Sequence, residues 1–244
     1  MKLNILYEDD YLIVIDKPAG LLTIPDRFDE TLPSARNLAE KKAGQKLWIV
    51  HRIDRETSGC LIFAKDEETH RSLSMQFQEH EVGKFYVGLV HGRIAEESGE
   101  IDLPLGEHPT IPGKMTVAKK GKASRTDYRV VEQWPLHALV QFRIHTGRTH
   151  QIRVHMQHLG HPLLCDPIYG DGEAFYLSSI KRKFNLSKSD EEERPLLSRL
   201  ALHSYKLVVL NGAGKQVTAE APMPKDLNAV VQQLRKWTAG KAPF

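Results

Sequence analysis

A polar segment held between two apolar runs most constrains how this chain can fold. Residues 47–50 and 60–64 each have the length and the β-branched or aromatic content of a buried strand. Residues 51–59, HRIDRETSG, separate these runs and place Asp54 between two arginines. Taken alone, this signature loop is compatible with a solvent-exposed hairpin loop that carries surface ion pairs. A charged loop on a rigid frame also commonly carries chemistry, so the rest of the sequence has to decide.

Length and composition limit the classes of protein to consider. The chain has 244 residues, 41% hydrophobic and 27% charged, as expected for a globular protein in water. Its formal charge of +3 permits a polyanionic partner without requiring one. Cys60 and Cys165 are too few for a disulfide scaffold and fit a reducing compartment. We recognise neither a signal peptide nor an apolar run of the ~20 residues that a membrane span needs, so we expect a cytoplasmic protein without a membrane partner.

The remaining patterns predict strands and helices that do not alternate as regular βαβ units. Alternating apolar residues and turn signals predict strands at residues 5–7, 11–15, 84–92, 126–134, 137–145, 202–210 and 215–221. Capping residues and helical spacing predict helices at residues 34–43, after Asp66, and at residues 147–159 and 226–237. This order favours an α+β fold with a mainly antiparallel or mixed sheet and flanking helices. No shift in composition marks a boundary, so we expect a single domain over residues 1–244.

Residues 147–159 carry the strongest helical pattern. Ile152, Met156 and Leu159 recur at helical spacing and are expected to form the buried stripe of this helix. Three basic side chains are expected in its first two turns: Arg148, His150 and Arg153. A helix N-terminus beside arginines is a natural seat for a phosphate group.

Two long segments are predicted to be irregular. Residues 104–125 form a variable loop rich in glycine and proline, with the lysines Lys114, Lys119, Lys120 and Lys122. These lysines would suit an RNA phosphate backbone, although a solvated lysine loop would have the same sequence. Residues 170–199 are polar and are expected to form a surface insertion.

Several kinds of site are not supported by the sequence. Four histidines between residues 150 and 161 lack a metal-ligand spacing and are interspersed with arginines, which would oppose a cation. Phosphate-loop and dinucleotide motifs are absent, and there is no Gly-x-Ser-x-Gly nucleophile motif. We therefore expect no metal and no nucleotide cofactor. One carboxylate, several arginines and an aromatic strand at residues 84–86 remain, a combination that suits an enzyme acting on a nucleic acid without a cofactor.

Five sequence blocks in order resemble the RluA-type RNA pseudouridine synthases. The signature loop resembles the signature of that family, and the other blocks are residues 11–20, 84–86, 146–162 and 202–203. One such block can arise by chance, whereas five in the family's order form a specific pattern across residues 5–222. The resemblance implies the pseudouridine synthase fold, with a central RNA-binding cleft. It also implies an isomerase that converts uridine to pseudouridine in ribosomal or transfer RNA, acting as a monomer without a cofactor.

The resemblance also assigns roles to individual residues. Asp54 is the matching catalytic carboxylate, which attacks the ring, attacks the anomeric carbon or removes a sugar proton. Tyr86 matches the active-site tyrosine, and Arg153 matches the arginine that lowers the pKa of the carboxylate. Arg52 matches an arginine that fills the gap left by the extruded base. Three further residues would contact phosphate or the uracil site: Arg148, His150 and Ile152. Arg55 is expected only to brace the signature loop.

Departures from the family pattern leave two alternatives open. Asp16 stands where asparagine is common, and residues 210–212 replace a His-Pro pair. We also expect the chain to lack the small RNA-binding module of many relatives, so that its own loops or partners recognise RNA. The first alternative is a non-catalytic RNA-binding protein of the same fold. The second is a hydrolase that cleaves a glycosidic bond with Asp54.

Overall fold

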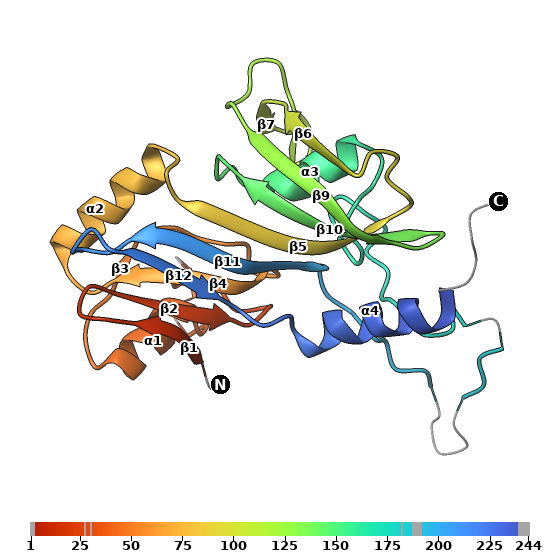
Figure 1. Ribbon diagram of the computed structural model, residues 1–244, viewed down its shortest axis with the longest axis horizontal. Helices are drawn as coiled ribbons and strands as arrows, with labels where there is room; N and C mark the ends of the chain where they lie inside the picture. The colour runs from red at the N-terminus through yellow and green to blue at the C-terminus, as the bar shows by residue number, and fades with distance from the viewer. Residues whose placement is uncertain (1–2, 27, 30, 182, 187–191, 239–244) are drawn as a thin grey trace. The chain divides into compact units, whose positions relative to one another are not determined.

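The computed structural model of the protein describes residues 3–26, 28, 29, 31–181, 183–186 and 192–238. The chain divides into two compact units, each built from several segments. Unit 1 comprises Met1–Tyr86, Arg143–Thr146 and His203–Pro222, and unit 2 comprises Val87–Phe142, Gly147–Leu202 and Met223–Phe244. The predicted α+β class with a mixed, mainly antiparallel sheet is confirmed (Figure 1).

The strands of unit 1 form a sheet around β4 (Ser58–Ala64). The order runs from β1 (Asn4–Glu8) through β2 (Leu12–Lys17) and β4 to β11 (Leu202–Leu210), with β12 (Gln216–Glu220) beside β11. The predicted hairpin of β1 and β2 is confirmed, and so is the hairpin of β11 and β12. The second edge of β4 pairs antiparallel with β3 (Trp48–Ile49) at one end and parallel with β11 at the other.

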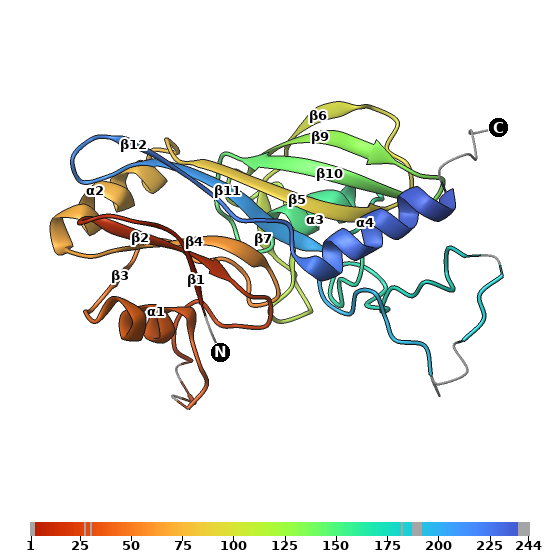
Figure 2. The same ribbon diagram turned by 60° about the horizontal axis from the view of Figure 1, so that its bottom comes forward.

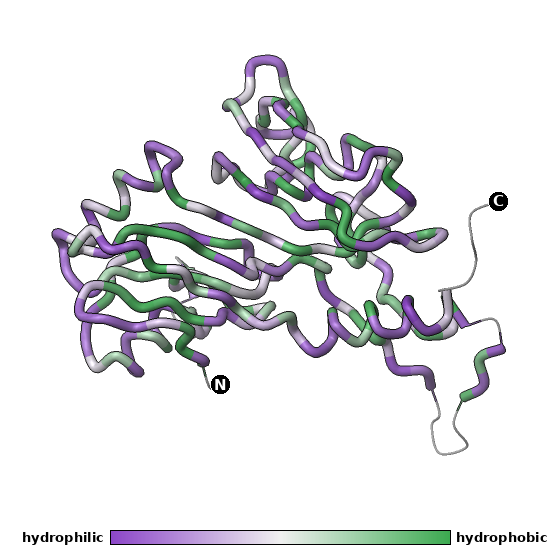
Figure 3. The backbone as a smooth tube through the Cα atoms, in the orientation of Figure 1, coloured by the Kyte–Doolittle hydropathy of each residue, from purple (hydrophilic) through white to green (hydrophobic). Residues whose placement is uncertain are grey.

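Two helices cover opposite faces of this sheet because successive side chains of a strand point to opposite sides (Figures 1 and 2). α1 (Ala35–Ala43) packs Ala35 and Ala39 against Ile13, Ile15 and Phe63. α2 (Glu67–Gln78) packs Leu73 on the other face, with the cluster of Leu12, Val14, Ile62 and Leu207. All seven residues of β4 are buried, and hydrophobic residues follow β2 and β4 in Figure 3.

Local capping explains where these helices begin and end. The Ser34 side chain accepts a hydrogen bond from the Asn37 backbone N–H at 3.2 Å, and Asp66 accepts one from Thr69 at 2.7 Å. Gly44 ends α1 in the left-handed conformation, with φ of 69°. These boundaries confirm the helices predicted at residues 34–43 and after Asp66.

Unit 2 is built on a second run of paired strands. Its order is β5 (Gly83–His91), β10 (His137–Ile144), β9 (Arg125–Gln133) and β6 (Ser98–Asp102), and both β5 and β10 contribute residues to each unit. Its helices are α3 (Gln151–His158) and α4 (Lys225–Thr238). The buried face of α4 consists of Leu227, Val230, Val231 and Leu234. In the described part of the chain, no helix has the length and apolar content to cross a membrane.

Two predictions about unit 2 were wrong in part. The expected loop at 104–125 contains the antiparallel strands β7 (Leu105–Glu107) and β8 (Met115–Val117), and Leu105 also exchanges backbone hydrogen bonds with Lys122. The helix expected at 147–159 is shorter, so Arg148 and His150 precede it rather than fall within its first turns. Leu159 is 39% exposed and does not belong to the buried stripe.

The described residues between 170 and 199 contain no helix or strand, as predicted, although Phe175 and Leu197 form an isolated antiparallel bridge. Residues 182 and 187–191 of this expected insertion lie outside the described residues. The assignment of the whole chain to one domain stays a prediction.

Candidate active site

Asp54 begins a tight turn in the signature loop between β3 and β4. The Thr57 backbone N–H donates to the Asp54 carbonyl oxygen at 3.1 Å, which places Arg55 and Glu56 at the tip of the turn. Asp54 is partly buried, whereas its neighbour Ile53 is buried and Arg55 is exposed. The turn thus holds a carboxylate at the border of the core of unit 1.

A buried lysine fixes the backbone of this loop. Lys17 is completely buried, and its ammonium group donates to the carbonyl oxygens of Leu21 at 2.8 Å, Arg55 at 2.9 Å and Pro18 at 3.0 Å. Arg55 in turn donates from Nε to the Gly20 carbonyl oxygen at 3.0 Å, as expected of a bracing residue. A buried cation of this kind is tolerated because its hydrogen-bond donors are satisfied.

Two further contacts attach the loop to the sheet. The Ser58 hydroxyl donates to Nδ1 of His203 at 2.9 Å, and the other ring nitrogen of His203 donates to the Ala221 carbonyl oxygen at 3.3 Å. Both Ser58 and His203 are buried. The signature loop and the last sequence block, far apart in the chain, therefore meet in unit 1, and His203 has a structural role there.

His51 also helps to hold the signature loop in place. Its Nε2 accepts a hydrogen bond from the Ile62 backbone N–H at 3.2 Å, and its ring stacks on Phe77 with centroids 4.7 Å apart. Burial, together with the positive charge of Lys84, lowers the pKa of His51 to about 3. The ring is therefore neutral at physiological pH, and it acts as a hydrogen-bond acceptor.

Tyr86 on β5 lies close enough to Asp54 to sense its charge. Its side chain is buried, and burial raises the pKa of the phenol, while the negative charge of Asp54 raises it further and the nearby Ser204 hydroxyl opposes the shift. The phenol therefore keeps its proton at neutral pH and can donate a hydrogen bond. Asp54 and Tyr86 are thus brought together within unit 1.

Arg52 differs from these buried groups because it is exposed. Its side chain makes no hydrogen bond or ion pair with the described residues, so it is available to a partner. This availability agrees with its predicted role toward RNA, which stays a prediction.

Arg153 belongs to unit 2, and its side chain is buried there. Its Nε donates to Asp166 Oδ2 at 2.8 Å, and its Nη2 donates to Asp166 Oδ1 at 2.7 Å. Sequence reasoning missed Asp166. The only available signal was a lone acidic residue between apolar Cys165 and Pro167, after the Gly-His-Pro end of the fourth block. The pairing of Arg153 with Asp54 stays a prediction.

The other predicted residues near α3 have different surroundings. Arg148 is partly buried, and its Nε donates to the Ala123 carbonyl oxygen at 3.0 Å. His150 has a left-handed backbone with φ of 56°, and its Nδ1 lies 2.9 Å from the Tyr169 hydroxyl. Ile152 is 4% exposed and packs in the core of unit 2.

The four predicted lysines also belong to unit 2. Lys114 places its ammonium group 5.5 Å from the centre of the Tyr169 ring, a cation–π contact. Lys119, Lys120 and Lys122 are exposed, and among the described residues none of them forms an ion pair. Their charges are available to a polyanion.

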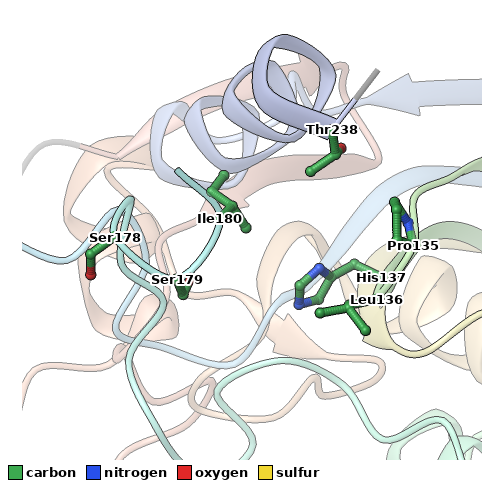
Figure 4. A pocket seen from close by; sticks show the side chains of 7 residues that line it. All are labelled: Pro135, Leu136, His137, Ser178, Ser179, Ile180 and Thr238. Carbon is green, nitrogen blue, oxygen red and sulfur yellow. The ribbon is translucent and has the colours of Figure 1, made fainter. Parts of the chain in front are cut away.

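Neither of two cavities in unit 2 is lined by a predicted site residue. One, of about 300 Å³, is lined by Pro135, Leu136, His137, Ser178, Ser179, Ile180 and Thr238 (Figure 4). The other, of about 250 Å³, shares Leu136, His137 and Ser179 with it. Within the described ranges, no group of three or more histidine, cysteine or acidic side chains is arranged to hold a metal ion.

The fold and these residues define an α+β protein with a carboxylate in a braced loop and, near it on β5, a buried tyrosine. Comparison with known proteins gives its family. The profile described as RNA pseudouridylate synthase matches residues 11–158, a range that contains Asp54, Tyr86 and Arg153. The chain belongs to the RNA pseudouridylate synthase family, and the resemblance to its RluA-type members is confirmed.

Two relatives are named ribosomal large subunit pseudouridine synthase D. The one from Nitrosomonas europaea is 38% identical over 96% of this chain and 65% of its own length. The one from Xanthomonas campestris is 36% identical over 98% of this chain and 72% of its own length. The chain thus spans about two thirds of the length of these relatives.

Solved structures support the same fold. Human RNA pseudouridylate synthase domain containing 4 superposes with a TM-score of 0.72 at 25% identity, covering 95% of this chain and 93% of that chain. Human RNA pseudouridylate synthase domain containing 1 gives 0.70 at 26% identity, covering 96% and 95%.

Proposed function

We propose that this protein isomerises uridine to pseudouridine in RNA, with Asp54 as the catalytic carboxylate. The observation that carries the proposal is the place of Asp54. It heads a turn braced by Lys17, beside the protonated phenol of Tyr86, within the region that matches the family. A fixed carboxylate next to a stacking and hydrogen-bonding ring suits work on a nucleobase and its sugar.

The reaction needs no external reagent. The bond between the anomeric carbon and the ring nitrogen breaks, the uracil turns, and a bond forms from the anomeric carbon to ring carbon 5. The proton on carbon 5 leaves, and the ring nitrogen gains one, so the product is an isomer of the substrate. Asp54 attacks the ring, attacks the anomeric carbon or removes a sugar proton. Each of these roles needs its ionised form.

The other residues would support this chemistry. Tyr86 stacks on the uracil and assists the proton transfer at carbon 5. Arg153 stabilises the ionised carboxylate, and the exposed Arg52 fills the gap left by the extruded base. Ile152 packs beneath the uracil site. Phosphate contacts come from Arg148 and His150 and from the four lysines of residues 114–122.

The names of the relatives favour ribosomal RNA as the substrate over transfer RNA. We further propose that the protein works as a monomer in the cytoplasm. Its two cysteines are both unpaired and buried, which suits a reducing compartment.

Tritium release from ribosomal RNA labelled at uracil carbon 5 tests the proposal. The wild-type protein is expected to release tritium and leave the RNA chain intact with pseudouridine in place. Asp54→Asn is expected to abolish release while the unfolding transition persists. Glu56→Gln is the matched control, because it removes a carboxylate two residues away in the same turn, and it should keep most of the activity.

Other outcomes identify the alternatives. Free uracil or an abasic product would indicate the glycosidic hydrolase. RNA binding by the wild-type protein without tritium release or uracil would indicate the non-catalytic RNA-binding protein. Release by Asp54→Asn at the wild-type rate would overturn the role of Asp54.

A further inference from the structure

Arg153 and Asp166 form a buried, bidentate ion pair within unit 2. Two parallel hydrogen bonds of 2.8 and 2.7 Å join them, with Asp166 at 0% exposure and Arg153 at 5%. A planar guanidinium bound through two donors to one carboxylate has a fixed orientation as well as a fixed position. Burial makes the pair sensitive to the loss of either partner.

Asp166 is itself held in place by the backbone that follows it. Its Oδ1 accepts hydrogen bonds from the backbone N–H groups of Ile168 at 2.9 Å and Tyr169 at 3.1 Å. Burial opposes ionisation of Asp166, but the hydrogen bonds and charge of Arg153, with these two N–H groups, lower its pKa overall. Asp166 is therefore a fixed anion, able to orient Arg153 throughout the neutral pH range.

Tyr169 supports the same guanidinium from another side. The central carbon of the guanidinium lies 5.0 Å from the Tyr169 ring centre, within cation–π range. The Tyr169 hydroxyl accepts a hydrogen bond from the Met115 backbone N–H at 2.8 Å and lies 2.9 Å from Nδ1 of His150. The turn of residues 166–169 thus holds both the carboxylate and the ring against Arg153.

We propose that Asp166 is the positioning residue of Arg153 in the isomerisation, with Tyr169 as the support of the pair. Asp166 binds both Nε and Nη2 of the guanidinium, so it fixes the orientation of the whole planar group. Because the guanidinium is already oriented before the substrate reacts, the entropic cost of orienting it does not add to the activation free energy. The inference rests on the proposed function, since it takes the role of Arg153 from it.

The variant Asp166→Asn tests this role, because it keeps the size of the side chain and removes its charge and one acceptor. We expect kcat for tritium release to fall by about 10- to 100-fold, since a small displacement of a catalytic group costs this much. KM for RNA should stay within about 3-fold, because substrate binding is not the step that depends on this orientation. Both constants are referred to the folded fraction, measured by circular dichroism.

A second arginine–aspartate pair in unit 2 provides a matched control. Arg199 donates from Nε to Asp226 at 2.7 Å and from Nη2 at 2.8 Å, in the same bidentate geometry. None of the predicted site residues takes part in it. Asp226→Asn should lower the free energy of unfolding but leave kcat of the folded protein unchanged. If Asp166→Asn behaves like Asp226→Asn, the pair is only structural and the proposal is overturned.

The variant Asp166→Glu keeps the test decisive if Asp166→Asn does not fold. It retains the charge but displaces the carboxylate by one methylene. We therefore expect its kcat to lie clearly below that of the wild type. A folded Asp166→Glu protein with the kcat of the wild type would overturn the positioning role. If the proposed function itself is wrong, the result is different: the wild-type protein releases no tritium.

Discussion

Gly59 lies directly against the backbone of Ser204. A Cβ atom on Gly59 would lie 2.1 Å from the Ser204 carbonyl oxygen, and the φ of Gly59 is +109°. The two residues are partners where β4 and β11 pair in parallel. The last position of the signature loop is therefore a glycine because the strand that carries His203 approaches too closely for any side chain. The loop of Asp54 depends on this contact for its place on the sheet.

We expect Gly59→Ala to destabilise the protein by about 3 kcal/mol or more, because it combines a backbone clash with a strained φ. Activity should fall as well, since relief of the clash moves the start of β4 and with it the turn of Asp54. Urea denaturation measures the stability, and tritium release at a temperature where the variant is folded measures the activity.

Gly214→Ala separates the two causes. Gly214 has a φ of +74°, but no atom lies within 4 Å of the position of its Cβ. Its replacement should cost only the ~1–2 kcal/mol of a left-handed residue and leave activity unchanged. Equal losses of stability in the two variants would show that the backbone at Ser204 moves away from the added Cβ atom at no cost in free energy.

The neutral state of His51 gives the protein a predictable dependence on pH. In the unfolded chain His51 binds a proton near pH 6.5, whereas burial and Lys84 lower its folded pKa to about 3. The stabilisation is therefore fully present above pH 6.5 and is lost as the pH falls toward 3. Between pH 7 and pH 5 we expect a loss on the order of 1–2 kcal/mol from this residue.

The comparison of His51→Gln with the wild type isolates this contribution. The variant should be less stable at pH 7, because it loses the stacking on Phe77, but its free energy of unfolding should fall less steeply toward pH 5. Gln157→Ala, which removes an exposed side chain that does not titrate, should keep the wild-type slope. An unchanged slope for His51→Gln in urea titrations at both pH values would contradict the assignment.

Features set by neighbouring residues were predictable from the sequence. Ser34, Gly44 and Asp66 act as caps through contacts within a few residues, so the bounds of α1 and the start of α2 follow from local chemistry. The start of α3 was not predictable in this way. His150 adopts a left-handed conformation supported by Tyr169, and Gln151 accepts a hydrogen bond from the Arg148 backbone N–H at 3.0 Å.

The site was predictable only where the residues matched a known family. Asp54, Tyr86 and Arg153 came from that resemblance, whereas Lys17 and Asp166 act through contacts with residues distant in the sequence. The strands β7 and β8 were not predicted because three-residue strands have too little alternation to be recognised. Their pairing depends on the chain folding back on itself through Leu105 and Lys122.

Lys119 and Lys120 allow a direct test of RNA binding, because both are exposed and their side chains have no partner among the described residues. The turn that carries them is closed by the backbone, since the Gly121 N–H donates to the Ala118 carbonyl oxygen at 2.7 Å. The double variant Lys119→Gln/Lys120→Gln should fold as the wild type. If both lysines contact phosphates, the slope of log K against log salt concentration should decrease by about 1.5.

The same double variant should raise KM for RNA several-fold and leave kcat unchanged, because phosphate contacts bind the ground state and the transition state equally. Lys41→Gln/Lys215→Gln is the matched control, since it makes the same change of charge at two exposed lysines of unit 1. This control should alter the salt slope much less. Equal slopes in the two double variants would mean that residues 119 and 120 act only through the net charge of the protein, and the β8 end of this loop would then have no place in the RNA interface.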